Sequence, residues 1–277
     1  MRQIDLQVLD VRGTPLPIIG FGTSGLPSDH CSAMVETALA LGYRHIDTAQ
    51  AYGNEAEVGR GIARSAVPRA EIFLSTKLEQ VNLGAAAVRR ATAESLARLG
   101  TDYVDLLMIH WPSEEVPMSE TLAAFAHLRA EGKVRNIGVC NFTLDLLREA
   151  VEQHGADLLC NQVECHPLLA QKKILPYLQS NGIALVAYSP LGRGRVVRNP
   201  ILRRIGAKYG KSSAQVSLAW LASQDLVAAI PKASSEAHCR ANLEIFDFVL
   251  SADDLDEIAG LDTGQRGIDP SWAPNWD

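Results

Sequence analysis

The sequence predicts an α/β protein built as a single (β/α)8 TIM barrel with an N-terminal β-hairpin. Two observations predict it. Short β-rich runs alternate with longer segments in which apolar residues recur at helical spacing, and no Pro/Ser/Gly-rich linker divides the 277 residues. Strands that are apolar on both faces and separated by helices form parallel sheets, and eight such units close into a barrel. A composition of 47% hydrophobic residues would also suffice for two smaller domains, so the unbroken alternation is what favours one domain over residues 1–277.

The expected elements follow one another at regular intervals. Residues 7–17 are expected to form the hairpin, with Arg12, Gly13 and Thr14 at its turn. Eight runs are predicted as barrel strands: residues 18–23, 44–48, 72–77, 104–110, 134–141, 158–164, 183–189 and 226–232. The segments between them carry helix signals, which are capping residues at Ser28, Thr143 and Ser212 and terminating glycines at Gly42, Gly100, Gly132 and Gly182.

Hydrogen-bonding residues stand at the end of every predicted strand. They are Thr23, Asp47, Lys77, His110, Asn141, the stretch from Gln162 to Glu164, Tyr188 with Ser189, and Lys232. In (β/α)8 barrels the C-terminal ends of the strands carry function, whereas the opposite rim serves stability. The sequence therefore predicts a polar site at one rim.

Asp47, Tyr52, Lys77 and His110 suit proton transfer to a carbonyl group. A free phenol has a pKa near ~10, and a neighbouring ammonium lowers it. We expect Lys77 to act in this way on Tyr52, Asp47 to hold the ammonium, and His110 to hydrogen-bond the substrate oxygen. Tyr52 would then protonate a carbonyl as hydride arrives. Each residue alone has an ordinary explanation as packing, snorkelling or capping, so the prediction depends on their meeting at one rim.

A competing pattern lies in Gly20, Gly22 and Gly25, which spell G-x-G-x-x-G after an apolar run. Asp47 follows at about the distance at which a Rossmann dinucleotide site places its ribose ligand. Against this interpretation, residues 26–28 separate the third glycine from the next helix, so that glycine could not leave a pyrophosphate on the helix N-terminus. A Rossmann-type dehydrogenase is the alternative that this pattern leaves open.

Composition narrows the class of partner to a small molecule. The net charge of -6 comes from interspersed acidic and basic residues, so we expect neither nucleic acid nor a membrane as partner. Residues 1–5 lack the pattern of a signal peptide, and no apolar run reaches the length of a membrane span, which predicts a cytoplasmic protein. The five scattered cysteines are expected to be buried thiols, and we expect no metal site, although Cys160, Cys165 and His166 cluster.

Four stretches resemble signatures of the aldo-keto reductase family. Residues 42–49 (GYRHIDTA), followed by residues 52–55 and Gly59, look like its first signature. Residues 101–106 leading to His110-Trp111-Pro112, residues 137–142 (IGVCNF) and residues 230–232 (IPK) match three more. The resemblance covers essentially the whole chain, and the ending over residues 273–277 is similar to that of bacterial 2,5-diketo-D-gluconate reductases.

The resemblance implies an NADPH-dependent reductase of aldehydes, dicarbonyls or keto-sugars. It implies Tyr52 as general acid together with His110, Lys77 and Asp47, and a substrate pocket walled by Trp111 beside His110 and Tyr52. In such a site Tyr188 would stack on the nicotinamide ring. The implied cofactor contacts are Gly22, Thr23, Asp47, Cys140, Asn141, Gln162, Tyr188, Ser189, Pro190, Leu191, Gly192, Lys232, Ala233, Ser234, His238 and Asn242.

Two positions depart from the family pattern. Cys140 stands where most members have serine, which is a better hydrogen-bonding group. His238 stands where an arginine usually binds the adenosine 2′-phosphate, and a neutral histidine offers at most one donor. Lys232, Ser234, Ser235 and Arg240 are the other candidates for this phosphate, so we expect NADPH preference with measurable NADH use.

A second alternative is a protein that binds the nucleotide without catalysis. A barrel that holds the nucleotide as a sensor or regulatory subunit would not need Asp47, Tyr52, Lys77 and His110 together, and this chain has all four. The expected oligomeric state, by analogy with relatives, is a monomer.

Overall fold

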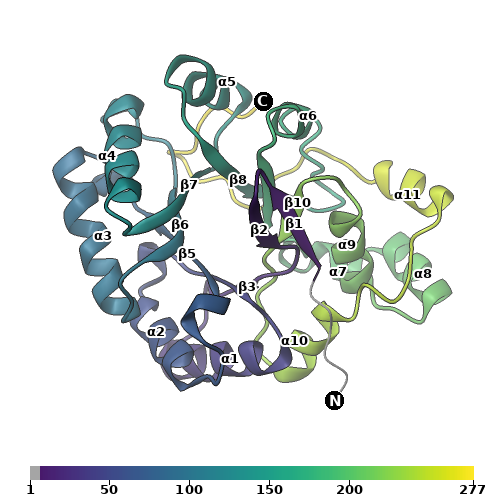
Figure 1. Cartoon of the computed structure of the whole chain (residues 1–277). Coiled ribbons are helices and arrows are strands. Elements are labelled where there is room, and N and C mark those ends of the chain that lie inside the picture. The colour runs from purple at the N-terminus through teal and green to yellow at the C-terminus, as the bar shows by residue number, and fades with distance from the viewer. Residues whose placement is uncertain (1–6) are drawn as a thin grey trace.

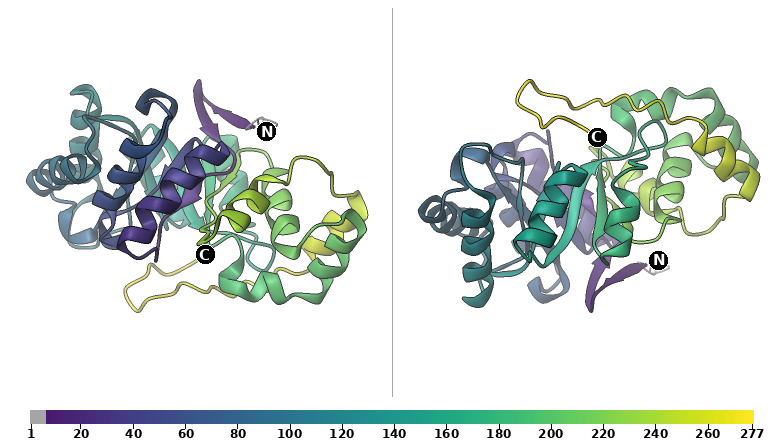
Figure 2. Two further views of the ribbon diagram at one scale, coloured as in Figure 1. Left: turned by 90° about the horizontal axis from the view of Figure 1, so that it is seen from below. Right: turned by 90° about the horizontal axis from the view of Figure 1, so that it is seen from above.

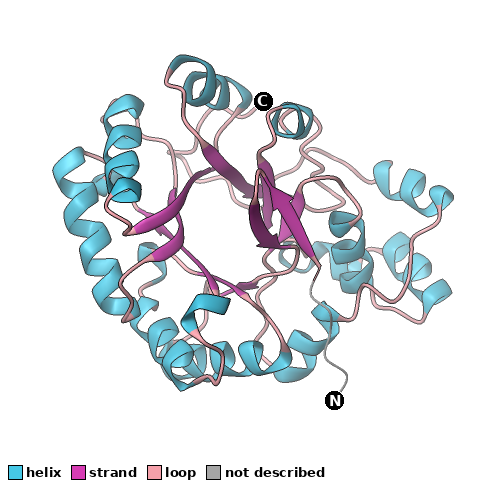
Figure 3. Cartoon of the chain, viewed as in Figure 1, coloured by secondary structure: helices cyan, strands magenta, loops and turns pink. Residues whose placement is uncertain are grey.

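Residues 7–277 of the computed structural model are described, and they form a ring of parallel strands surrounded by helices (Figures 1 and 3). The ring is one eight-stranded sheet in the order β10-β9-β8-β7-β6-β5-β4-β3. Its strands are β3 (Phe21–Gly22), β4 (His45–Asp47), β5 (Phe73–Leu78), β6 (Val104–Ile109), β7 (Val134–Cys140), β8 (Leu158–Glu164), β9 (Ala184–Tyr188) and β10 (Val227–Ala229). All eight predicted strands are confirmed, and their limits differ most at the two that close the ring. Residues 1–5, on which the expectation about a signal peptide rests, lie outside the described part of the chain.

The first and last strands of the sheet meet and close the barrel. Ile19 pairs in parallel with Ala229, and Gly20 N donates to Ala229 O at 2.8 Å. A Cβ at Gly22 would stand 2.7 Å from Ile230 O, so this closing seam leaves room only for glycine. The predicted (β/α)8 barrel is therefore confirmed. The Rossmann alternative is wrong, because a closed ring has no open-sheet crevice and Gly22 is needed for strand packing.

The predicted hairpin is also confirmed. Strand β1 (Val8–Val11) pairs antiparallel with β2 (Thr14–Pro17), and Arg12 and Gly13 turn between them with φ angles of 52° and 83°. Two positive φ angles are typical of the tight turns whose twist suits a hairpin. Val11 and Leu16 are buried among the residues that fill the barrel interior. The hairpin lies at one end of the barrel and the C-terminal tail at the other (Figure 2).

Helices cover the outside of the ring (Figure 1). They are α1 (Ser28–Leu41), α2 (Glu55–Arg64), α3 (Ala85–Leu99), α4 (Met118–Ala130), α5 (Leu144–Arg148), α6 (Leu175–Ser180), α7 (Arg195–Arg198), α8 (Pro200–Tyr209), α9 (Ser213–Ala222), α10 (Glu236–Leu243) and α11 (Ala252–Ala259). Within residues 7–277, no helix is long and apolar enough to cross a bilayer.

Most of the predicted helix ends are confirmed. The hydroxyls of Thr143 and Ser212 cap α5 and α9, and Gly42 and Gly100 end α1 and α3 in left-handed conformation. Gly132 and Gly182 also have positive φ, one residue beyond the cap of α4 and α6. The prediction of Ser28 as a cap is wrong. Pro27 takes that position with an extended backbone, and its carbonyl accepts from Cys31 N to close the first turn without a side-chain cap.

Candidate active site

The C-terminal ends of the strands surround a cavity of about 570 Å³. The predicted residues that line it are Gly22, Asp47, Tyr52, His110, Trp111, Cys140, Asn141, Gln162, Tyr188, Ser189, Pro190, Leu191 and Lys232. They come from the ends of different strands, which meet at this rim because the strands are parallel.

A buried ion pair forms the floor of the cavity. Lys77, near the end of β5, points its ammonium at Asp47, at the end of β4, with Nζ 2.6 Å from Oδ1. Thr48 O accepts a second ammonium proton at 2.8 Å. Burial acts to lower the pKa of Lys77, but the Asp47 carboxylate raises it above its ordinary value. Lys77 is therefore a fixed positive charge across the physiological range.

Tyr52 stands over this ammonium. It ends a single 3-10 turn, η1 (Gln50–Tyr52), that begins three residues after the end of β4, and its hydroxyl lies 3.4 Å from Lys77 Nζ. Burial raises the pKa of Tyr52, while Lys77 acts in the opposite direction and lowers it. The expected lowering by Lys77 is thus present, but burial outweighs it. The phenol therefore stays protonated at neutral pH.

His110 follows β6 and faces the same point. Its ring meets that of Tyr52 edge-on, with centroids 5.7 Å apart. Burial, followed by the charge of Lys77, lowers the pKa of His110 to about 3. The imidazole is therefore neutral at physiological pH and can offer a substrate oxygen a hydrogen bond without carrying charge.

Three further side chains form the opposite wall. Asn141, with a left-handed φ of 61°, donates to His110 O at 3.0 Å and accepts from the Tyr188 hydroxyl at 2.9 Å. Gln162 donates to Asp47 Oδ2 at 3.0 Å. These bonds hold the three side chains in one orientation around the floor.

Other predicted residues lie away from the cavity lining. Thr23 is buried and donates to Asp47 O, and Gly192 is buried in a tight turn against the His166 ring. Ala233 is buried, whereas Ser234 and His238 are exposed around the start of α10. Asn242 lies on the buried face of α10, next to the Tyr43 phenol.

The sequence did not point to Arg193 and Ile268, which both line the cavity. Arg193 lies in η5 (Gly192–Gly194), in a loop that turns through successive positive φ angles at Gly192, Arg193 and Gly194. A signal for it was available, since it directly follows the predicted run from Ser189 to Gly192. Ile268 had none, because its place depends on a contact between the tail and the end of β8.

The C-terminal tail crosses the mouth of the barrel (Figure 2). Glu164 at the end of β8 accepts from Gly267 N and Ile268 N, both at 2.9 Å. Trp272 and Trp276 then pack edge-on against Trp111, with centroids 4.9 and 6.0 Å away. The tail therefore completes the wall that Trp111 begins.

Glu164, which binds these two tail amides, is buried. Besides the tail it meets the His166 ring at 3.0 Å and Arg195 at 3.4 Å. Burial acts to raise the pKa of Glu164, but the bonds from His166, Ile268 and Gly267 lower it below its ordinary value. In the Cys160, Cys165 and His166 cluster, the histidine is thus engaged with Glu164, and all five cysteines of the chain are buried free thiols.

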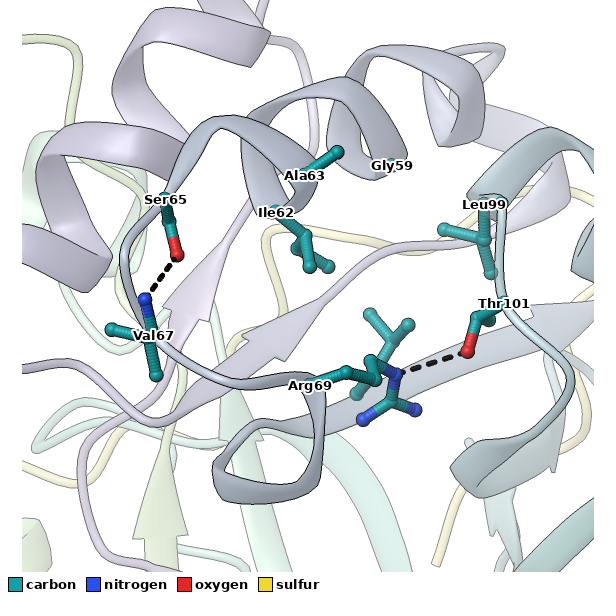
Figure 4. Close-up of a pocket in the computed structure, with 10 residues that line it drawn as sticks. Gly59, Ile62, Ala63, Ser65, Val67, Arg69, Leu99 and Thr101 are labelled. Carbon is teal, nitrogen blue, oxygen red and sulfur yellow. Dashed lines mark hydrogen bonds between the residues drawn. The ribbon is translucent and has the colours of Figure 1, made fainter.

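A smaller hollow of about 260 Å³ lies outside the barrel, between α2, α3 and the loop after α2 (Figure 4). Its polar groups are already paired. Ser65 accepts from Val67 N at 3.0 Å, and Arg69 donates to the Thr101 hydroxyl at 3.1 Å (Figure 4). This hollow therefore presents no free polar group for chemistry, in contrast to the cavity at the barrel rim.

The relatives of this sequence show its family. The model of the aldo/keto reductase family matches residues 18–263. The chain belongs to this family. It is 43% identical over 260 residues to an aldo-keto reductase of Mycolicibacterium smegmatis, covering 93% of this chain and 94% of that protein. It is 40% identical over 266 residues to methylglyoxal reductase DkgB of Escherichia coli O157:H7, covering 95% and 99%.

A solved structure assigned as a 2,5-diketo-D-gluconic acid reductase B superposes with a TM-score of 0.95 at 40% identity, covering 98% of each chain. The resemblance predicted from four short stretches is confirmed. This aldo-keto reductase is an oxidoreductase that acts on carbonyl groups, and the family uses nicotinamide cofactors.

Proposed function

We propose that the reductase uses NADPH to reduce small aldehydes, dicarbonyls or keto-sugars to alcohols, with Tyr52 as the general acid. The observation that carries the proposal is the Tyr52 hydroxyl, 3.4 Å from the buried ammonium of Lys77 at the floor of the cavity. A phenol is an effective acid only where a neighbouring charge stabilises its conjugate base. Lys77, held by Asp47, supplies that charge.

The roles of the four residues follow from their charges. The nicotinamide, when bound, supplies the hydride. Tyr52 gives its proton to the carbonyl oxygen, and Lys77 stabilises the phenolate that this leaves. His110, which is neutral, donates a hydrogen bond to the same oxygen and so favours the negative charge that develops there. Asp47 keeps the ammonium in place and takes no proton.

The chain offers groups that fit the rest of the cofactor. Asn141, Gln162 and Tyr188 face the cavity and would hold the nicotinamide, while the loop from Ser189 to Arg193 would lie over the pyrophosphate. The 2′-phosphate would meet the ammonium of Lys232, which is exposed at the rim. Anions are favoured near the N-terminus of a helix, and α10 begins just beyond this lysine.

Fewer groups than expected are available to that phosphate. Ser235 caps α10 by accepting from His238 N, and Arg240 pairs with Glu236 at 2.9 Å. Of the candidates, Lys232 and Ser234 keep their side chains open to solvent. We therefore propose NADPH preference with substantial use of NADH.

The proposed substrates are small because the tail narrows the site. Trp111 and the tail residue Ile268 line the cavity, and Trp272 and Trp276 pack behind Trp111. A relative named methylglyoxal reductase, 40% identical, supports a small dicarbonyl. We further propose a monomer that folds as one domain and works in the cytosol, where its five buried free thiols would stay reduced.

The test is turnover by the purified enzyme. Loss of NADPH absorbance with methylglyoxal is expected for the wild type, and Tyr52→Phe should lower kcat by at least about a hundredfold while leaving the Kd for NADPH nearly unchanged. Tyr177→Phe is the matched control, since this phenol bonds Glu152 outside the barrel. Near-normal turnover by Tyr52→Phe would exclude the proposed acid, and NADPH binding without turnover of any carbonyl would favour the sensor alternative.

A further inference from the structure

A second row of polar side chains lies beneath Asp47, inside the barrel. Ser75 on β5 donates to Asp47 Oδ2 at 2.8 Å, and its hydroxyl oxygen lies 3.1 Å from His45 Nε2 on β4. The register places Asp47 opposite Ser75, and His45 lies two residues before Asp47 on the same face of β4. All three side chains are buried.

The protons available on His45 and Ser75 fix the direction of the hydrogen bonds that link them to Asp47. The Asp47 carboxylate, ion-paired with Lys77, can only accept. The single hydroxyl proton of Ser75 has two acceptors in reach, Asp47 Oδ2 at 2.8 Å and Ile46 O at 3.4 Å, and it goes to the closer, charged oxygen of Asp47. The Ser75 oxygen must then accept, and the donor is His45 Nε2–H. His45 is therefore the Nε2–H tautomer, whose Nδ1 carries no proton. Among residues 7–277, no group hydrogen-bonds this Nδ1.

The ring is held neutral and in place. Burial lowers the pKa of His45 to about 4, with Asp47 acting against it and Lys77 reinforcing it. Phe73 packs edge-on against the ring at 5.1 Å between centroids. A Cβ at Gly20 would come within 2.6 Å of His45 Nδ1, so the first glycine of the G-x-G-x-x-G pattern makes room for this ring.

We propose that Ser75 and His45 are positioning residues that orient the Asp47 carboxylate and, through Asp47 and Lys77, set the acidity of Tyr52. The inference rests on the proposed role of Tyr52 as the acid. Asp47 receives Lys77 on one oxygen, and Ser75 and Gln162 on the other. Without Ser75 the second oxygen keeps one donor, its negative charge is less dispersed, and the carboxylate is free to turn.

The direction of the effect on Tyr52 follows from charge. A less dispersed carboxylate disfavours the phenolate, so loss of the Ser75 hydroxyl makes Tyr52 a weaker acid. Reduction needs the protonated phenol, so the fall in kcat/KM at high pH moves to still higher pH. Besides Asp47 and Tyr52 themselves, the titratable groups that share this space are Lys77, His45, His110, Cys140, Cys160 and Tyr188. Of these six, only Lys77 is charged near neutral pH.

Ser75→Ala tests the inference, with Thr76→Val as its matched control. Thr76 is the next residue on β5, is equally buried, and donates to another carboxylate, Glu55, at 2.6 Å on the opposite face. Ser75→Ala should move the basic limb of kcat/KM for NADPH-dependent methylglyoxal reduction upward by about half a pH unit. It should also lower kcat at neutral pH by about threefold to tenfold, with the Kd for NADPH retained. Thr76→Val should lower the melting temperature without moving the limb.

An unshifted limb in Ser75→Ala, or an equal shift in Thr76→Val, would overturn the inference. A second measurement does not depend on a variant that folds well. The ¹⁵N shifts of His45 in the wild type, assigned by their loss in His45→Gln, should show the neutral Nε2–H tautomer, and an Nδ1–H tautomer would overturn the chain of bonds. Tyr52→Phe separates the two proposals. If this variant stays active, the role of Tyr52 as the acid fails. If it is inactive while the basic limb of kcat/KM in Ser75→Ala is unshifted, only the role of Ser75 and His45 fails.

Discussion

Lys77 Nζ lies 2.6 Å from Asp47 Oδ1, and each of the two side chains is 1% exposed. A buried ion pair adds little net stability, because removing both charges from water costs about as much as their attraction gains. Here the remaining bonding capacity of both groups is used, since Thr48 O accepts from the ammonium and Ser75 and Gln162 donate to the carboxylate. The pair is therefore best explained by its chemistry, which is to present a fixed positive charge to Tyr52.

Lys77→Met should abolish turnover and also weaken the fold. The variant leaves the Asp47 charge buried without its partner, which destabilises a protein by about 3–5 kcal/mol. Thermal and urea unfolding would show this loss, and NADPH consumption should fall by at least about a hundredfold. The double variant Asp47→Asn with Lys77→Met should recover much of the stability and none of the activity. Recovery of activity in the double variant would contradict the assigned role.

The pH profile of kcat/KM for reduction should have a single limb, at alkaline pH, and no limb near neutrality. The pKa of His110 is lowered to about 3 by burial and by Lys77, so the imidazole does not titrate between pH 5 and 9. The pKa of Tyr52 is raised by burial, so kcat/KM should stay flat through neutral pH and fall only at alkaline pH as the phenol loses its proton. Steady-state rates with methylglyoxal across that range check this. A limb near pH ~6.5 that disappears in His110→Gln would contradict it.

The fold and the floor of the site could be predicted because both follow from local sequence. Apolar runs mark the strands, and a residue that ends a parallel strand of a barrel must lie at the rim, which is why the sequence alone groups Asp47, Lys77 and His110. Tyr52 joins them since it stands only a few residues beyond β4. The length of the turn is what places its hydroxyl over Lys77.

The remaining features depend on contacts that no local pattern encodes. Ser75 meets Asp47 because of the register between β4 and β5, and a sequence does not show which residues lie opposite each other in parallel strands. Ile268 reaches the cavity because Glu164, far away in the chain, accepts from two tail amides. Ser28 looked like a helix cap, but the fixed φ of Pro27 placed the start of α1 one residue earlier.

Glu164→Gln should loosen the tail without stopping the chemistry. The neutral amide loses the charge-assisted bonds from His166, Gly267 and Ile268, so the KM for the carbonyl should rise by about threefold to tenfold while kcat changes little. Limited proteolysis should cut the tail faster. Glu149→Gln, on the outer surface, is the control. A fall in kcat with unchanged KM would mean that Glu164 acts on the catalytic floor instead.

The same carboxylate should make the tail sensitive to acid. The pKa of Glu164 is lowered in the folded protein, so its stabilising contribution is present above the ordinary carboxyl range and is lost as the pH falls through the folded-state value. Fluorescence of Trp111, Trp272 and Trp276 should report the release, since their edge-on contacts depend on the tail. Glu164→Gln should show the acid form of the signal at neutral pH. If wild type and variant gave the same fluorescence titration, this carboxylate would not be the tether.

His238→Arg should sharpen the preference for NADPH. His238 is exposed in the first turn of α10, six residues after Lys232, and an arginine there could bind a phosphate through two parallel hydrogen bonds. The KM for NADPH should fall by about tenfold, while the KM for NADH, which has no 2′-phosphate, should stay within about twofold. Ala237→Arg controls for added charge alone, because the neighbouring position on the helix points a side chain elsewhere. An equal fall in KM for both cofactors would show that the added charge acts at long range. A wild-type enzyme that used NADH as efficiently as NADPH would refute the preference for NADPH itself.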